Sequence, residues 1–193
     1  MKILICGAGA LGSHFAYLAR DLGADLELSV IDFDRVETKN LASQWFVKQM
    51  VGKNKATALK MQWQNFYGLR LKDYTVRLTG ENVATILGDQ DLVIDCFDNA
   101  ESRQLIQGFV RENGIACLHG GLAADGEYGV VRWDSDFVID SEDVPGQATC
   151  EGGGFLPVIL AVSGALTAAV LNYQKDNSHR ENWNLTPRGA EAF

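Results

Sequence analysis

Residues 2–12 read KILICGAGALG, an apolar run followed directly by glycines at positions 7, 9 and 12. Lys2–Cys6 predicts a buried strand, and residues 13–22 predict a helix because their apolar side chains recur on one face. Glycines in a turn between a strand and a helix let the backbone approach a phosphate group, and the amino terminus of the helix adds partial positive charge. Gly7, Gly9 and Gly12 therefore predict a nucleotide-binding loop.

Apolar runs and helical patterns alternate along the chain outward from this loop. We expect strands over residues 26–31, 74–78, 92–95, 115–118 and 128–133, and helices over residues 53–66, 81–87, 100–112 and 155–173. This alternation predicts an α/β Rossmann-like fold, in which helices cover both faces of a mostly parallel sheet. We expect one domain over residues 1–175, followed by a polar C-terminal tail or a partial final strand over residues 176–193.

Ligands of such sheets bind at the carboxyl ends of the strands. We therefore expect the chemistry at the glycine loop, from Asp32 onward, at residues 95–99 and at residues 119–121. His119 lies at one of these expected strand ends, where a structural histidine is the favoured interpretation and a group facing the site is the alternative. His14, on the first helix, is expected to be packed or exposed.

Asp32 ends the second expected strand, 20 residues after Gly12. A carboxylate at this place can hold the hydroxyl groups of a ribose. With the glycine loop it predicts nucleotide binding, and these features alone would suggest an NAD-dependent oxidoreductase. The alternative is a plain strand-to-helix turn with Asp32 as a surface acid.

The composition limits the class of protein. The 193 residues are 47% hydrophobic and 22% charged, so the chain has enough apolar side chains for a real core. Its net charge of −8 argues against a nucleic-acid partner or an anionic membrane surface. We expect a cytoplasmic location without a zinc site or disulfide framework, because no C-x-x-C pair occurs among the four cysteines. We expect three of them, Cys6, Cys96 and Cys117, to lie in the core.

Two segments imitate membrane signals. The first ten residues loosely resemble a secretion signal, but their apolar part is shorter than the roughly 7–15 residues that such signals need. Residues 152–174 carry no charge and are long enough to span a bilayer, although a helix buried against a sheet shows the same pattern. We expect no membrane association.

Four further motifs follow the glycine loop in a fixed order. They are IDFDRVETKNLASQ at 31–44, GKNKA at 52–56, DCFDN at 95–99 with Arg103 after it, and TCEGGGFLP at 149–157. This order resembles the ubiquitin-activating (E1-like) adenylyltransferase superfamily, which includes the ThiF, MoeB and HesA activators of sulfur-carrier proteins. The resemblance covers roughly residues 1–175 and implies that the uncharged segment is a core helix.

The resemblance implies ATP-dependent adenylation of the C-terminal carboxylate of a small ubiquitin-like or sulfur-carrier protein. Two anions meet in that reaction, so charge neutralisation and positioning carry the catalysis. It implies that Lys55 and Asp98 are catalytic, that Asp98 also holds magnesium, and that Asp32 holds the ribose of ATP. The other residues that would line the nucleotide are Gly7, Gly9, Ala10, Leu11, Gly12, Asp34, Asn40, Gln44 and Asn99.

Cys150 precedes the last expected helix. The resemblance implies that a cysteine at this place can bond covalently to the activated carrier or to sulfur, a role that needs the thiolate. The alternative is a small thiol in a loop. We include Cys150 among the candidate catalytic residues.

Three features depart from the family pattern. Ser43 stands where the family has an arginine that would contact the ATP phosphates, and a serine cannot replace its charge. Arg35 or Lys39 could compensate. The sequence opens on its first strand, so we expect no amino-terminal helical segment like the one with which many relatives reach the partner subunit. The zinc-binding cysteine pairs of the family are missing, so no zinc is expected.

Each site residue also has a plainer interpretation. Lys55 could be a solvated lysine on a helix, and Asp98 with Asn99 could only cap the helix that follows. Arg103 could simply pair with Asp98 or Asp95. Ordinary loop positions are the plainer interpretation of the polar residues Asn40 and Gln44.

The whole chain leaves two alternatives to an active adenylyltransferase. The first is a degenerate member of the superfamily that binds nucleotide or a partner without turnover. The second and less favoured is the NAD-dependent oxidoreductase, which has no reason to hold Lys55 and Asp98 at these places. Because the resembled enzymes form dimers, we also expect a homodimer.

Overall fold

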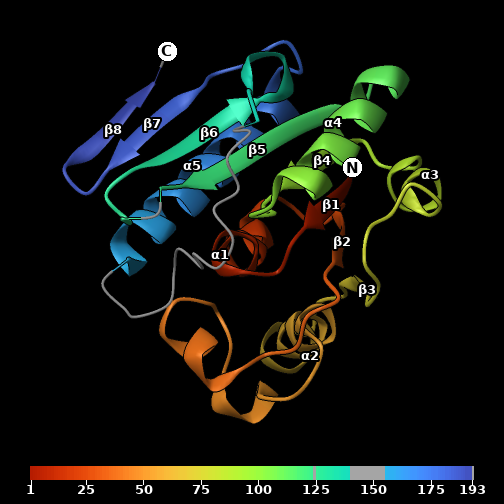
Figure 1. Ribbon diagram of the computed structural model, residues 1–193, viewed down its shortest axis with the longest axis vertical. Coiled ribbons are helices and arrows are strands. Elements are labelled where there is room, and N and C mark those ends of the chain that lie inside the picture. Colours follow the sequence, from red (N-terminus) through yellow and green to blue (C-terminus); the bar gives the residue numbers. More distant parts are fainter. Residues whose placement is uncertain (124, 140–154, 193) are drawn as a thin grey trace.

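The computed structural model describes residues 1–123, 125–139 and 155–192. Within this part of the chain, eight strands form one sheet in the order β3-β2-β1-β4-β5-β6-β7-β8 (Figure 1). The strands are β1 (Lys2–Cys6), β2 (Glu27–Ile31), β3 (Lys72–Tyr74), β4 (Leu92–Asp95), β5 (Ala116–Leu122), β6 (Gly129–Trp133), β7 (Trp183–Thr186) and β8 (Gly189–Ala192). The helices are α1 (Ala10–Leu18), α2 (Lys55–Tyr67), α3 (Val83–Leu87), α4 (Ala100–Asn113) and α5 (Leu156–Lys175).

The sheet has a parallel half and an antiparallel half. Strands β3, β2, β1, β4 and β5 pair in parallel, and β6, β7 and β8 are added antiparallel. The carboxyl ends of the five parallel strands therefore meet at one edge of the sheet, where ligands of such folds bind. The expected α/β Rossmann-like fold is confirmed.

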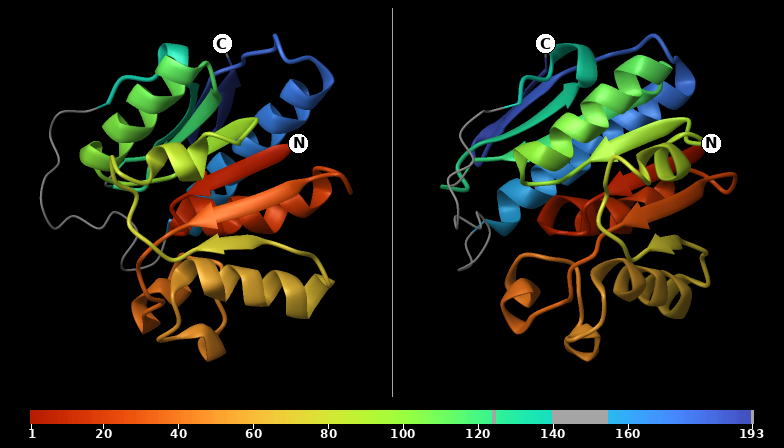
Figure 2. Two further views of the ribbon diagram at one scale, coloured as in Figure 1. Left: turned by 90° about the vertical axis from the view of Figure 1, so that its right-hand side faces the viewer. Right: turned by 45° about the vertical axis from the view of Figure 1, so that its right-hand side comes forward.

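Alternate residues of β1 point into two separate cores. Ile3 and Ile5 pack in the cluster that holds α1, α2 and α5, whereas Leu4 and Cys6 pack in the cluster that holds α3 and α4 (Figure 2). Side chains alternate across a strand, so a strand that is apolar at every position fits only a sheet covered on both faces.

Two strands differ from the sequence-based expectation. The strand expected over residues 74–78 is β3, which begins at Lys72 and ends at Tyr74 because it pairs only with Ser29, Val30 and Ile31 of β2. Leu78 is buried in the α3–α4 cluster without being in a strand. The strand expected over 115–118 continues to Leu122, because β6 pairs with it antiparallel as far as that residue. Residues 119–121 thus lie inside β5 and not after it.

The closing residues are not a plain tail. Residues 183–186 and 189–192 form β7 and β8, an antiparallel hairpin that joins the sheet through β6. The sequence pattern gave at most one partial strand there. The pairing partner that makes two strands possible is β6, about fifty residues earlier in the chain.

Helix α5 is the uncharged segment that imitates a membrane span. It has 20 residues and is long and apolar enough to cross a bilayer by length and composition alone. In this structure α5 packs on α1 and on β5, β6 and β7, and its buried residues belong to the larger core cluster. The observed packing is that of the core helix implied by the resemblance.

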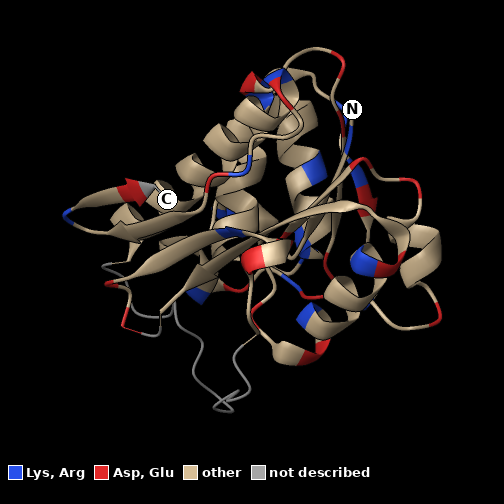
Figure 3. Cartoon of the chain, turned by 90° about the horizontal axis from the view of Figure 1, so that it is seen from above, with Lys and Arg blue, Asp and Glu red and all other residues tan. Residues whose placement is uncertain are grey.

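Charged residues of both signs are distributed over the helices and loops. Figure 3 shows lysine and arginine interspersed with aspartate and glutamate. The nearest partner of several cations is an acidic side chain, as in the pair of Lys60 with Asp73 at 2.7 Å. The expectation of no nucleic-acid partner stays a prediction, and the mixed surface is consistent with it.

Candidate functional site

The three glycines of the loop have different reasons to be glycine. Gly7 has a φ of 95°, a backbone conformation that side chains rarely adopt. A Cβ on Gly12 would lie 1.8 Å from the carbonyl oxygen of Gly7, so Gly12 lets α1 pack against the turn. A Cβ on Gly9 would meet nothing within 4 Å in the described residues. The fold requires the outer two glycines, and Gly9 leaves backbone open at the start of α1.

The residues after Gly9 are buried. Leu11 is 6% exposed, and its side chain lies close to Gly120 in the core. Ala10 is buried as well, and its carbonyl oxygen accepts a hydrogen bond from Nδ1 of His14. The contact of Ala10 and Leu11 with a nucleotide stays a prediction.

A continuous series of contacts joins the glycine loop to Lys55. The N–H of Ala8 donates to Asp32 Oδ2 at 2.7 Å, and the N–H of Asp34 donates to Asp32 Oδ1 at 2.8 Å. The Asp34 carboxylate pairs with Lys55 Nζ at 3.3 Å. Burial raises the pKa of Asp32, while Lys55 and the two N–H donors oppose that shift. Asp32 therefore fixes the loop to β2, and its predicted contact with a ribose would use the remaining lone pairs of the same carboxylate.

Lys55 is the first residue of α2 and is almost fully buried. Its plainer interpretation, a solvated helix lysine, is wrong, because the ammonium lies against Asp34 and its stem is packed. Asn54 caps the same helix by accepting from the N–H of Thr57. The cap and the burial hold the Lys55 ammonium at the edge of the sheet, next to Asp32.

The loop at residues 95–99 touches the glycine loop. A Cβ on Gly7 would lie 3.0 Å from the carbonyl oxygen of Cys96, so the two loops are in contact at the ends of β1 and β4. Asn99 caps α4 by accepting from the N–H of Ser102 at 2.9 Å. Asp98 is exposed, and within the described ranges its carboxylate has no hydrogen-bond or ion-pair partner. The plainer interpretation as a cap holds for Asn99 but not for Asp98.

Arg103 forms neither of the ion pairs expected for it in the described part of the chain. Its Nε donates to the carbonyl oxygen of Phe97 at 2.7 Å, and its Nη2 donates to that of Gly120 at 2.9 Å. The expectation of a pair with Asp98 or Asp95 is therefore wrong. Arg103 instead fastens the loop after β4 to β5.

Asn40 and Gln44 lie in and after the 3-10 turn Thr38–Ala42. Asn40 is buried, and its Oδ1 accepts from the N–H of Glu37 at 2.8 Å, so it has a structural contact of its own. Gln44 Oε1 is buried without a partner among the described residues. A pocket of about 140 Å³ is lined by Gln44 together with Ser43 and His14. Their contact with phosphates stays a prediction.

The cations suggested as substitutes for the missing arginine have contacts elsewhere. Arg35 Nη1 donates to the carbonyl oxygen of Gly52 at 2.8 Å, and Lys39 lies 3.7 Å from a carboxylate oxygen of Glu37. Ser43 itself is buried. No feature of these contacts directs either cation to Ser43.

The cysteines divide into core thiols and Cys150. Burial raises the pKa of Cys6, Cys96 and Cys117, so these thiols are neutral near pH 7, and Cys6 and Cys117 are core residues as expected. Cys96 is only partly buried in the loop after β4. Cys150 lies outside the described residues, and its covalent role stays a prediction.

The sequence pattern missed a buried cluster beside this edge. His119 Nδ1 lies 2.8 Å from Asp95 Oδ2, and His119 Nε2 lies 3.1 Å from Asp134 Oδ1. Asp95 and His119 are register partners on β4 and β5, so equal distance along adjacent parallel strands was a signal that could have paired them. Asp134 follows β6, and no local pattern brings it there. The favoured interpretation of His119 as a structural histidine fits its complete burial.

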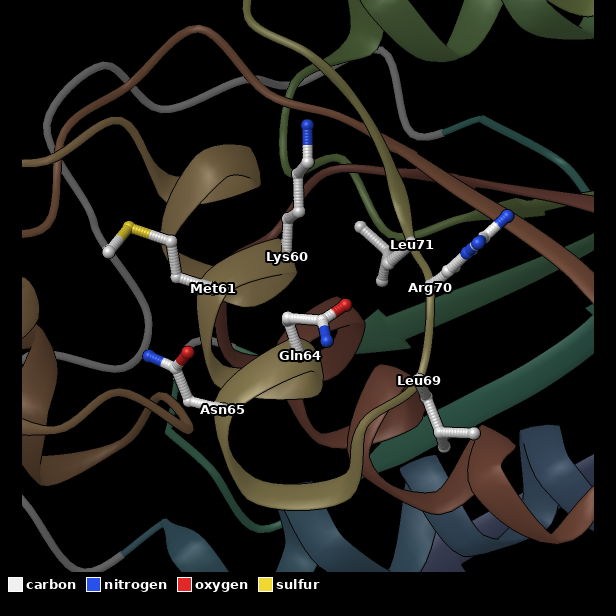
Figure 4. A pocket seen from close by; sticks show the side chains of 7 residues that line it. All are labelled: Lys60, Met61, Gln64, Asn65, Leu69, Arg70 and Leu71. Carbon is white, nitrogen blue, oxygen red and sulfur yellow. The ribbon is translucent and has the colours of Figure 1, made fainter.

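A second pocket, of about 340 Å³, lies away from this edge. It is formed by the exposed side of α2 and the segment that follows it (Figure 4). Figure 4 shows that Lys60 and Gln64 of the helix stand opposite Leu69 and Leu71. None of the residues that line it belongs to the glycine loop, the contacts of Asp32 or the loop at 95–99. The pocket therefore adds nothing to the candidate site.

Comparison with known proteins gives one family. The ThiF family profile matches residues 1–178. The chain is 30% identical over 94% of its length to the adenylyltransferase and sulfurtransferase UBA4 of Lodderomyces elongisporus, of which it covers 42%. It is 30% identical over 87% of its length to the sulfur carrier protein adenylyltransferase of Thermus thermophilus, of which it covers 66%. The chain thus spans less than two thirds of the length of these relatives.

Solved structures show the same fold. The microcin C7 biosynthetic enzyme MccB in complex with N-formylated MccA has a TM-score of 0.78 and 17% identity, covering all of this chain and 63% of that one. E. coli MccB with ATP has a TM-score of 0.76 and 16% identity, with 62% of that chain covered. At these identities the likeness concerns the arrangement of helices and strands.

Proposed function

The chain belongs to the ThiF family, and from this premise we propose that it catalyses the ATP-dependent adenylation of the C-terminal carboxylate of a small ubiquitin-like or sulfur-carrier protein. The carboxylate of the carrier attacks the α-phosphate of ATP, an acyl-adenylate forms, and pyrophosphate leaves. The relatives named above as adenylyltransferases support the reaction class. The proposal also includes a cytoplasmic location and a homodimer.

One observation carries the proposal: the contacts from Ala8 through Asp32 and Asp34 to Lys55 begin at a loop whose Gly9 is open. Among the described residues, no neighbouring atom lies where a Cβ on residue 9 would stand. A glycine there is needed where a ligand phosphate approaches the backbone. In the proposed reaction Lys55 neutralises the phosphates as a point charge, and Asp34 holds its ammonium in place until the nucleotide binds.

Magnesium fits the donor set as a cation bound together with ATP. Within the described residues no group of three or more histidine, cysteine, aspartate or glutamate side chains could form a protein-only metal site. Magnesium is usually held by one or two carboxylates plus substrate phosphates and water. Asp98 supplies one exposed carboxylate without a competing partner in the described ranges. When bound there, the ion would neutralise charge on the phosphates.

A non-catalytic nucleotide-binding role is the second candidate, and Ser43 favours it. At the position where the family has an arginine that would contact the phosphates, this chain has the buried Ser43. A serine can donate one hydrogen bond but carries no charge. Such a chain would bind ATP through the glycine loop and fail to turn it over.

Two measurements separate these candidates. Calorimetric titration with ATP and magnesium, and in parallel with NAD, identifies the nucleotide. ATP-pyrophosphate exchange in the presence of candidate carrier proteins then detects turnover. Adenylation predicts binding of ATP and exchange that depends on the carrier. Binding of ATP without exchange supports the non-catalytic role, and tighter binding of NAD refutes both. Sedimentation analysis tests the homodimer.

A further inference from the structure

A buried cationic group lies between two acids behind the loop that carries Asp98. His119 and Asp95 are fully buried, and Asp134 is largely buried. The ring of His119 stacks on Phe137, with the ring centroids 4.0 Å apart and the planes 6° from parallel. The cluster therefore joins β4, β5 and the residues after β6 through buried side chains.

The contacts of His119 define its charge. Each ring nitrogen faces a carboxylate oxygen, and a carboxylate can only accept hydrogen bonds. Both nitrogens must then donate, which describes the imidazolium. Burial lowers the pKa of His119. The hydrogen bonds with Asp134 and Asp95, and the charge that Cys117 acquires only near pH 11, outweigh burial and raise the pKa of His119 to about 11.

The other charged groups around the ring agree with this assignment. Arg111 and Gln107 of α4 donate to the Asp134 carboxylate at 2.7 and 3.0 Å, which keeps that group ionised. Burial alone would raise the pKa of Asp134, but the donors lower it to about 2. Cys117 lies 3.5 Å from His119 Nε2 and is a neutral thiol near pH 7, because burial raises its pKa to about 11. The two carboxylates thus provide the negative charge near the ring.

Asp95 transmits this arrangement to the loop. Its Oδ2 accepts from His119, and its Oδ1 accepts from the N–H of Phe97 at 3.0 Å. Phe97 is also held through its carbonyl oxygen by Arg103, which bonds to Gly120 next to His119. A buried carboxylate without a counter-charge is costly, so loss of the imidazolium would change the protonation or hydration of Asp95 and release Phe97.

We propose that His119 is a positioning residue: held between Asp95 and Asp134, it fixes the loop at residues 95–99 and thereby the carboxylate of Asp98. The proposal rests on the proposed function for its consequence, the binding of ATP with magnesium. Its structural half, the order of the loop, does not depend on that function. His119 touches neither Asp98 nor the open backbone at Gly9, so its effect passes through Asp95 and Phe97.

Two substitutions of His119 separate its two contacts. His119→Asn places an amide donor near the position of Nδ1 and retains a hydrogen bond to Asp95. His119→Gln places the donor near the position of Nε2, toward Asp134, and leaves Asp95 without a partner from β5. Both variants remove the charge and the stacked ring. A purely structural histidine predicts similar losses in the two variants.

Asp134 and Asp136 provide a matched pair should His119 variants fold poorly. Both lie in the 3-10 turn Asp134–Asp136 after β6, but only Asp134 contacts His119. Asp136 accepts from Ser135 and Asn182 instead. Asp134→Asn keeps the shape and removes the charge that faces the ring. Asp136→Asn removes a charge from the same turn without touching the cluster.

The experiment combines hydrogen exchange of the free protein with nucleotide titration. We expect the fastest amide exchange at Phe97 in His119→Gln, which loses both the charge and the hydrogen bond to Asp95. His119→Asn, which keeps that hydrogen bond, and Asp134→Asn, which keeps the ring, should show smaller increases, and Asp136→Asn should match the wild type. The magnesium concentration for half-maximal pyrophosphate exchange should rise by roughly 10–100-fold in His119→Gln, the range found when a support of a metal ligand is removed. The half-saturating concentration of the carrier should stay unchanged.

The outcomes distinguish the two proposals. Unchanged exchange at Phe97 in folded His119→Gln and Asp134→Asn overturns the positioning role, whatever the activity. An equal rise of the half-saturating concentrations of magnesium and carrier also overturns it, because a general loss of order moves both. If the wild type shows no pyrophosphate exchange, the proposed function fails, and exchange at Phe97 alone then decides the positioning role.

Discussion

The carboxyl edge of the parallel sheet has two halves that differ in what they expose. At β1 and β2 the glycine loop leaves backbone open at Gly9, and Asp34 is half exposed. At β4 and β5 the polar groups Asp95 and His119 are fully buried, and Asp98 in the loop after β4 is exposed. The first half offers backbone to a ligand. In the second half the buried polar groups hold the loop that carries one exposed carboxylate. The residues that support the site are therefore different from the residue that would contact the ligand.

Substitution of the glycines gives the largest expected effect and tests the first half. Gly12→Ala places a Cβ 1.8 Å from the carbonyl oxygen of Gly7, so α1 or the turn must move. We expect a loss of at least about 3 kcal/mol in the free energy of unfolding, at the upper end of overpacking costs, or no folded protein. Urea denaturation measures this loss.

Gly9→Ala is the control within the same loop. Its added Cβ meets nothing in the described residues, and its φ is negative. We expect a loss of at most about 1 kcal/mol, typical of a changed helix cap, together with strongly weakened ATP binding. Normal ATP affinity in the Gly9→Ala protein would show that the open backbone is not the nucleotide site.

Asp98→Ala has the next largest effect and tests the second half. The carboxylate is exposed and has no partner in the described ranges, so stability should change by less than about 0.5 kcal/mol. Pyrophosphate exchange should fall at least about a hundredfold, because loss of several kcal/mol of charge neutralisation corresponds to that factor. Thermal melting is measured alongside.

Asn99→Ala is the matched control for Asp98→Ala. Asn99 caps α4, and its loss should cost about 1 kcal/mol in stability with much less effect on exchange per folded molecule. A destabilised Asp98→Ala protein with normal activity per folded molecule would make Asp98 a structural residue and reverse the roles assigned to these neighbours.

The first half of the edge was predictable because its signals are local. Gly7, Gly9, Gly12 and Asp32 occur at fixed spacing between one strand, one helix and the next strand, and short-range spacing survives folding unchanged. The mostly parallel sheet and the helices on both of its faces were predictable from the alternation of strand and helix patterns. The parts that failed, the end of β5 and the strands β7 and β8, depend on pairing with β6, and β7 reaches β6 across about fifty residues of chain.

The second half was only partly predictable. Asp95 and Asp98 belong to a readable motif, but Arg103 bonds to carbonyl oxygens in place of the expected acids. Every residue has a backbone carbonyl oxygen, so residue types do not show which of these oxygens will accept a hydrogen bond from Arg103. Asp134 reaches His119 only because β6 runs antiparallel beside β5, and a pattern read as a mostly parallel sheet gives no such neighbour.

The dependence of stability on pH should distinguish the buried half of the edge, at β4 and β5, from the open half at β1 and β2. The pKa of His119 is raised to about 11 in the folded protein, so the imidazolium contributes stability that is complete below the unfolded pKa of about 6.5 and is lost as the pH rises toward 11. Between pH 6.5 and 8.5 the free energy of unfolding should fall by at most about 1.4 kcal/mol per pH unit, the limit for one proton.

Urea denaturation across that window, in the wild type and in His119→Gln, measures the slope. The difference between the two slopes isolates His119, because the buried cysteines, whose pKa values are raised, and His14, whose pKa is lowered, contribute equally to both proteins. Equal slopes in the two proteins would show that His119 is not the group that titrates. Asp32, on the open half, also has a raised pKa, and it contributes equally to the two proteins.

The smallest expected effect belongs to Ser43→Arg, at the pocket beside α1. Ser43 is buried, so an arginine side chain must extend into the pocket of about 140 Å³ that Ser43, Gln44 and His14 line. Burial lowers the pKa of His14, so its neutral ring does not repel a guanidinium near pH 7. We expect a cost of about 1 kcal/mol in stability for the larger side chain.

Activity should stay unchanged, or rise by about tenfold or more if the guanidinium reaches the phosphates, since a charge-assisted hydrogen bond contributes roughly 1.5–3 kcal/mol. Ser43→Gln, of similar reach and without charge, separates the charge from the volume. Pyrophosphate exchange is measured for both variants with and without a partner subunit. A fall in Ser43→Arg only when the partner is present would mean that a cation from the partner already occupies this place, because two cations beside one phosphate group repel each other. A fall in both variants without a partner would contradict the prediction, since volume alone would then explain it and the pocket would not face the phosphates.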